Sequence, residues 1–220
     1  MEQIKSRTIT DPLRRLLFLC LGLIIMAFGV AFSIKAGLGT SPISSVPYVT
    51  SEISGLSVGT TTIIMNFFFV LIQIAILRRK YDWFQVLQFP AAILFGFTID
   101  AAEWVIAPLP CWGYLQAWVY CALGIVLIAL GVSVEVMANL VTTAGEGIVL
   151  AICQVAPVKF GNMKMFFDVT LVCIAIVLSL VFLHHLAGVR EGTIAAAILV
   201  GQITKQTNKL TKKLEAAAVR

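Results

Sequence analysis

The chain has 220 residues, of which 60% are hydrophobic and 12% are charged, and its formal net charge is +5. Uninterrupted apolar runs longer than a β-strand exclude a soluble domain and predict an all-α integral membrane protein. The positive charge is typical of the topology signal that flanks membrane spans, so we expect no nucleic-acid partner.

The first half of the chain predicts three spans and one short helix. Gly37-Leu38-Gly39 breaks the first helix, and Thr40-Ser41-Pro42 starts another, with a hydroxyl at the cap and proline in the first turn. This helix has about 13 residues, or about 20 Å, which is too short to cross a hydrocarbon core of about 30 Å. The expected order is a basic lead (1–15), a span (16–34), the short helix (41–53) and spans at 59–77 and 83–104.

The second half predicts the same order of elements. A second break is followed by a second short helix, and Thr143 and Glu146 have the spacing of a capping box at its start. A basic amphipathic tail suits an anionic lipid surface. The expected order is a linker (107–114), a span (115–137), the break (139–143), a short helix that ends near 155, spans at 161–183 and 192–203, and the tail (205–220).

The two halves also resemble each other in sequence. Residues 129–150 align without a gap with residues 27–48, and six of these 22 pairs are identical. Past a three-residue slip, residues 196–201 align with residues 91–96. We interpret the chain as two copies of one membrane unit. The predicted copies are repeat 1 (16–106) and repeat 2 (115–204).

Two topologies compete, with six or with eight spans. With the N-terminus in the cytoplasm, six spans leave 14 of the 16 Lys and Arg inside, whereas eight spans expose Arg78-Arg79-Lys80 outside. The positive-inside rule and the short helices favour six spans, with both termini cytoplasmic. Because each repeat then has three spans, the second copy is inverted, and each short helix is re-entrant, one from each face of the membrane.

The paired breaks predict a binding site. Non-helical backbone at membrane depth is tolerated where it lines a cavity, and the N-termini of half-helices favour an anion or a polar oxygen. The alternative is that the glycines only permit close helix packing. The candidate binding residues are Gly37, Gly39, Thr40, Ser41, Ser44, Asn139, Thr142, Thr143 and Gly145.

Intramembrane polar residues are candidates for ion coupling. Asp168 lies about 10 Å into its span, at the position that Asn66 occupies in the first repeat. It is a candidate for proton or cation coupling, as is Glu146, although Asp168 can instead pair with Lys164 and Glu146 can cap its own helix. Glu135 is expected to reach the inner interface. No enzyme signature, cofactor motif or metal-ligand spacing is present, so we expect no enzyme, cofactor or metal site.

Three segments resemble the YczE/YyaS/YitT group of bacterial multi-pass membrane proteins. They are GLGTSPISSVPYVTS after the first span, Gly161 to Asp168, and Arg190-Glu-Gly-Thr-Ile before the last. The resemblance implies a bacterial cytoplasmic-membrane protein of five or six spans, and it transfers no mechanism. The matching positions are Gly37, Gly39, Thr40, Ser41, Pro42, Asp168, Gly192 and Thr193.

The sequence therefore supports three hypotheses for function. The first is a secondary transporter or exporter of a small polar or anionic solute, which binds between the two half-helix N-termini and is coupled to protons or cations. The second is a passive channel of the same architecture. The third is a scaffold or regulatory subunit that transports nothing. The solute, the direction, the coupling ion and a homodimeric state are left open by the sequence.

Overall fold

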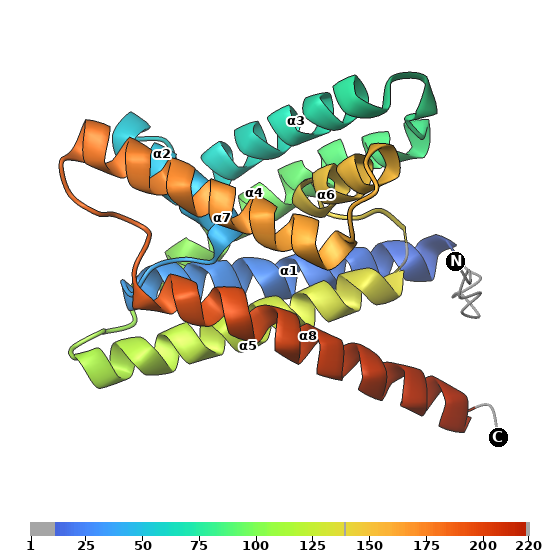
Figure 1. The fold of residues 1–220 in the computed structure, drawn as a ribbon. Coiled ribbons are helices and arrows are strands. Elements are labelled where there is room, and N and C mark those ends of the chain that lie inside the picture. The colour runs from blue at the N-terminus through green and yellow to red at the C-terminus, as the bar shows by residue number, and fades with distance from the viewer. Residues whose placement is uncertain (1–11, 139, 219–220) are drawn as a thin grey trace.

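The computed structural model describes residues 12–138 and 140–218, and all regular elements in these residues are helices (Figure 1). This confirms the all-α fold class. The helices are α1 (Pro12–Ala36), α2 (Pro42–Ser54), α3 (Val58–Leu77), α4 (Gln88–Ile106), α5 (Tyr114–Ala138), α6 (Ala144–Val155), α7 (Phe160–Leu178) and α8 (Glu191–Ala218), with short 3₁₀ and π turns at η1 (Arg78–Lys80), η2 (Trp83–Leu87) and η3 (Ser179–Leu183).

Five helical segments of the described chain are long and apolar enough to cross a bilayer. The sixth predicted span, 192–203, is the apolar start of α8, which continues without a break through the predicted tail to Ala218. Crossing by α8 therefore stays a prediction. The five segments are Leu13–Ala36, Val58–Lys80, Trp83–Ile106, Tyr114–Ala138 and Phe160–Leu183.

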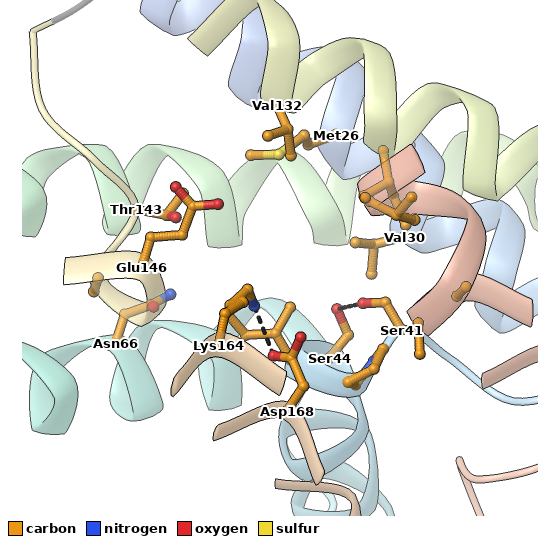
Figure 2. A pocket seen from close by; sticks show the side chains of 18 of the residues that line it. Met26, Val30, Ser41, Ser44, Asn66, Val132, Thr143, Glu146, Lys164 and Asp168 are labelled. Carbon is orange, nitrogen blue, oxygen red and sulfur yellow. Dashed lines mark hydrogen bonds and ion pairs between the residues drawn. The ribbon is translucent and has the colours of Figure 1, made fainter. Parts of the chain in front are cut away.

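The two short helices α2 and α6 have 13 and 12 residues, close to the predicted lengths. Gly37 and Gly39 make the turn before α2 with φ of 65° and 96°, a left-handed backbone that glycine adopts without strain. Pro42 opens α2, where its missing N–H costs no hydrogen bond. The predicted capping box of α6 is wrong: Thr143 makes no side-chain cap bond. Glu146 faces a cavity instead (Figure 2).

The antiparallel pair of α1 and α5 forms the centre of the fold (Figure 1). Their backbones approach at glycines: a Cβ on Gly22 would lie 2.9 Å from the Gly131 carbonyl, and a Cβ on Gly29 would lie 2.9 Å from the Gly124 carbonyl. Such close contact between small residues is typical of packed membrane helices. The two glycines of each helix are the 102-residue mates of the two on the other.

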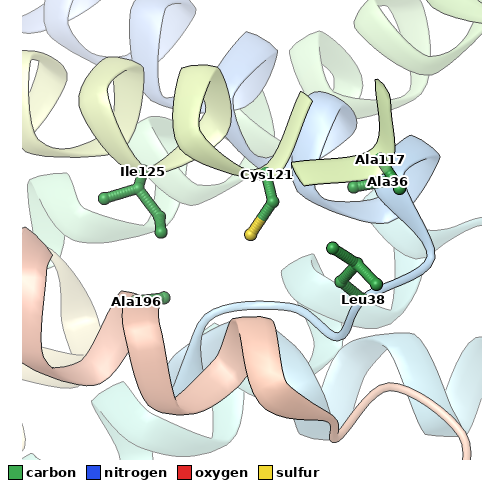
Figure 3. Close-up of a cluster of buried hydrophobic side chains, with 6 residues drawn as sticks. All are labelled: Ala36, Leu38, Ala117, Cys121, Ile125 and Ala196. Carbon is green, nitrogen blue, oxygen red and sulfur yellow. The ribbon is translucent and has the colours of Figure 1, made fainter. Parts of the chain in front are cut away.

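The remaining helices surround this pair and interlace the two halves of the chain. α4 packs on α1 and α8 packs on α5, whereas each short helix packs on a long helix of the other half, α2 on α7 and α6 on α3. Small apolar clusters hold the outer helices to the centre. One joins α5 to α8 through Cys121, Ile125 and Ala196, beside Leu38 of the first break (Figure 3).

The two halves differ in how their last two long helices pack. α3 packs along α4, but over the described residues α7 and α8 make at most slight contact with each other. In Figure 1 they run as two separate ribbons, joined by a loop at the end away from the start of α1.

Candidate functional site

A cavity of about 730 Å³ lies between the N-terminal ends of α2 and α6. Its volume is in the range of about 300–1,000 Å³ that is typical of small-molecule sites. Every helix from α1 to α8 contributes to its wall. Most lining side chains are apolar, and the polar ones that concern us are Ser41, Ser44, Asn66, Glu135, Thr143, Glu146, Lys164 and Asp168.

The tip of α2 presents hydroxyl groups to the cavity. The Ser41 hydroxyl donates a hydrogen bond of 3.0 Å to the Ser44 hydroxyl, and both side chains are buried. Ser41 is the N-cap residue of α2 but makes no side-chain cap bond. Free N–H groups at such a helix end attract a polar oxygen.

The tip of α6 presents carboxylates. Glu146 lies in its first turn, and Glu135 of α5, only 5% exposed, accepts a hydrogen bond from the backbone of Thr143. The positive end of the α6 dipole stabilises negative charge at this place. Figure 2 shows Glu146 and the Ser41–Ser44 pair on opposite sides of the cavity. The prediction for Glu135 was wrong, because its side chain is buried on the cavity wall and does not reach the inner interface.

An ion pair occupies the wall between these two tips. Lys164 Nζ lies 2.6 Å from Asp168 Oδ1, one turn apart on α7, with both side chains about one quarter exposed. The predicted pairing of Asp168 with Lys164 is thus present. The pair also lines the cavity, as a role in ion coupling would require. Asn66 of α3 lines the same cavity and is 8% exposed. The described residues hold no cluster of three His, Cys, Asp or Glu suited to a metal ion.

A model described as "Family of unknown function (DUF6198)" matches residues 13–209, which include both tips and the ion pair. The chain belongs to the DUF6198 family. Two relatives are proteins of Bacillus subtilis (strain 168). "Uncharacterized protein YyaS" is 29% identical over 133 residues, 60% of this chain and 65% of YyaS, just under two thirds of its length. "Uncharacterized membrane protein YczE" is 29% identical over 187 residues, 84% of this chain and 80% of YczE.

These relatives confirm the resemblance to the YczE/YyaS group, and with five apolar spans they identify this DUF6198 chain as a multi-pass membrane protein. No solved structure matches it. The family description and the names of both relatives assign no activity.

The predicted binding residues of this DUF6198 chain fall into three groups. Ser41, Ser44, Thr142 and Thr143 line the cavity. Gly145 does not, since it packs against Ile43 and a side chain there would collide with it. Asn139 lies outside the described residues.

The third group, Gly37, Gly39 and Thr40, binds the segment before α8. The Thr40 N–H donates to the Gly188 carbonyl at 2.9 Å, and Arg190 donates to the Gly37 carbonyl at 3.0 Å. A Cβ on Gly39 would collide with Thr193. These residues hold α8 in place, as the packing alternative for the glycines expects, and they do not form the cavity wall.

Proposed function

We propose that this DUF6198 protein is a secondary transporter or exporter of a small polar solute, built as two inverted three-span repeats in the bacterial cytoplasmic membrane, and that the solute binds between the tips of α2 and α6. The observation that carries the proposal is the meeting of both half-helix tips in one cavity. Broken helices that face each other across such a cavity are typical of transporters.

The packing of the helices supports the inverted repeats. When positions in the two halves are matched, α1–α4 packing corresponds to α5–α8 packing, and α3–α6 packing corresponds to α7–α2 packing. The cluster of Figure 3 has a counterpart around α1, in which Leu19 and Leu23 take the places of Cys121 and Ile125. In this arrangement α8 is the counterpart of α4, and it forms the sixth span.

The contrast between α3–α4 and α7–α8 supports alternating access. Gly59 meets the backbone of Gly96, and the Asp100 carboxylate accepts hydrogen bonds of 2.7 Å from the Ser57 hydroxyl and from the Gly59 N–H. At the matching glycines of the second repeat, Gly161 and Gly201, no atom of the described residues lies within reach of a Cβ. We propose that these are the closed and the open form of one joint, so that the solute site is accessible on one side.

The charges at the site support a solute with a positively charged group. Half-helix tips alone favour an anion. However, the cavity contains three carboxylates, Glu135, Glu146 and Asp168, against Lys164. An amine can bind near the carboxylates of α6 while its polar partner group binds the hydroxyls of α2. Asp168 and Glu146 are the proposed proton or cation carriers, since an intramembrane carboxylate binds either ion to offset its burial.

The test begins with thermal stabilisation of the purified protein by amines, zwitterions and anions at two pH values, because a ligand of the folded state raises its apparent stability. Each stabilising compound is then measured for flux in proteoliposomes with an imposed proton gradient. We expect Asp168→Asn to abolish the gradient-driven flux. Glu103→Gln is the control, since Glu103 lies on α4 outside the cavity.

Other outcomes separate the alternatives. Flux that persists without any gradient dependence, in the wild type and in Asp168→Asn alike, identifies a passive channel. Absence of stabilisation and flux across the whole panel rejects transport and supports a scaffold or regulatory subunit.

A further inference from the structure

We propose that the cavity opens sideways into the lipid between α7 and α8, and that its ligand is an amphiphile with an amine head at the two tips and an apolar chain in the gap. This inference rests on the proposed function and specifies its substrate class. The starting observation is that α7 and α8 do not close on each other as α3 and α4 do.

The gap lies along the membrane-spanning part of α7. Met165, Val169 and Cys173 of α7 line the cavity and are nevertheless exposed, Met165 at 66% and Val169 at 55%. They span nine residues, or about 12 Å along the helix. On α8, Ile194 and Ile198 line the cavity and are 65% and 54% exposed. Side chains that face the cavity and the outside at once mark the opening.

The chemistry of this rim indicates lipid and not water outside. Its exposed lining residues are apolar on both helices, whereas an aqueous entrance at membrane depth would need polar side chains. An apolar ligand chain in the gap therefore lies among apolar side chains and lipid tails, and none of its surface has to face water.

The opposite end of the cavity suits a charged head. Glu135 and Glu146 stand at the tip of α6, and the Lys164–Asp168 pair lies between this tip and that of α2 (Figure 2). A ligand with one positive charge offsets part of the negative charge of the three carboxylates, which Lys164 alone does not balance. The site thus combines a polar, acidic end with an apolar lateral exit, which is the pattern of a single-chain amine.

Sequence pattern explains why this side is open. The Ser57–Asp100 hydrogen bond closes α3 on α4. The positions that match these two residues, by the offsets of 102 and 105, are Lys159 and Lys205. Two ammonium groups repel each other where the first half has an attractive pair. Repeat 2 therefore lacks the bond that closes repeat 1.

The experiment uses tryptophan fluorescence of the full chain in nanodiscs of phosphatidylcholine with brominated acyl chains, which quench indole on contact. The four native tryptophans are replaced by Phe. The reporter is Phe95→Trp, on the cavity wall, and the control is Phe69→Trp, which is buried outside the cavity. We expect strong quenching of the reporter and little quenching of the control. Equal, weak quenching of both overturns the lateral opening, as would occur if a second copy covered the gap.

The ligand class is tested by displacement of the quenching lipid. Dodecylamine should relieve the quenching at about tenfold lower concentration than dodecanoate, which has the same chain and the opposite charge, and butylamine, which lacks the chain, should have no effect. Glu146→Gln should weaken the dodecylamine effect about tenfold, the cost of one hydrogen bond to a charged group. Equal relief by dodecylamine and dodecanoate overturns the amine head.

Flux measurements separate this inference from the proposed function. Relief by dodecylamine without any amine flux in proteoliposomes retains the binding site and rejects the transporter. Flux of butylamine without relief by dodecylamine retains the transporter and rejects the lipid entrance.

Discussion

At the scale of single residues, two glycines 102 positions apart have opposite surroundings. A Cβ on Gly59 would collide with the Gly96 carbonyl and with Asp100, whereas a Cβ on Gly161 would meet open space. We predict that Gly59→Ala lowers the free energy of unfolding by about 1–3 kcal/mol, the cost of overpacking. Gly161→Ala should raise it by about 0.5 kcal/mol through helix propensity. Thermal unfolding in one detergent measures both.

The same pair of variants also reports on transport. If α7 closes on α8 at Gly161 as α3 does on α4 at Gly59, then Gly161→Ala is a stable protein that has lost flux. A Gly161→Ala variant with full flux would show that this joint never closes.

The Tyr81 hydroxyl is buried and has no hydrogen-bond partner among the residues that the structure describes. Burial, followed by the charge of Asp82, raises the pKa of Tyr81 above its ordinary value of 10.0. The folded state therefore resists ionisation, and stability falls as the pH rises above about 10, where the unfolded chain ionises. We predict that Tyr81→Phe stabilises the protein by about 1 kcal/mol and flattens this alkaline loss. Melting temperatures at neutral and alkaline pH test it, and a destabilised variant would mean that the hydroxyl has a partner.

At the scale of helices, the bond that closes α3 on α4 can be transplanted. Lys159→Ser with Lys205→Asp places the Ser57–Asp100 pair between α7 and α8. We predict that this double variant draws the two helices together. Spin labels at Met165→Cys and Ile198→Cys should then give a shorter distance distribution than in the parent with the same labels.

The matched control removes charge without adding a hydrogen bond. Lys159→Ser with Lys205→Leu relieves the repulsion but offers no acceptor, so it should shorten the distance less. Identical distributions in all three proteins would contradict the interpretation of α7–α8 as an open joint.

The sequence predicts the short helices well, because glycine, proline and length are local signals. The bounds of α2 and α6 lie within about one residue of their prediction. The predicted capping box of Thr143 and Glu146 was wrong although the two residues have the right spacing. The Glu146 carboxylate turns into the cavity, a direction that depends on tertiary packing and not on local sequence. The prediction separated a span at 192–203 from a tail at 205–220 because charged residues begin at Lys205. In the structure α8 continues through this position, since no proline interrupts the helix.

At the scale of the whole molecule, the number of crossings fixes the sides of the termini. α1 begins and α8 ends on the same side in Figure 1, which an even number of crossings requires. We predict that alkaline phosphatase, active only outside the cytoplasm, is inactive when fused after Ala218 and active when inserted after Trp112. An active fusion after Ala218 would instead mean that α8 does not cross the membrane.

The candidate site was predictable only where local sequence signals determine it. Ser41 and Thr143 could be placed at the cavity because each precedes a short helix, and the inverted repeats that we propose bring the starts of these two helices together. The roles of Gly37 and Gly39 could not, because Arg190, which donates a hydrogen bond to Gly37, and Thr193, which packs against Gly39, lie about 150 residues away. The gap between α7 and α8 could not be predicted either. It depends on a few residues that differ between two similar halves of the sequence, and the hydrophobic pattern of the helices does not show them.

The unbroken course of α8 has a mechanical consequence. Its 28 residues form a rod of about 42 Å, of which only the first part is apolar enough to lie in the membrane. A tilt of about 10° at the gap would swing the far end by about 7 Å, given that length. If α8 crosses the membrane as we propose, it acts as a lever, so that a partner bound to its basic end changes the width of the gap beside the cavity.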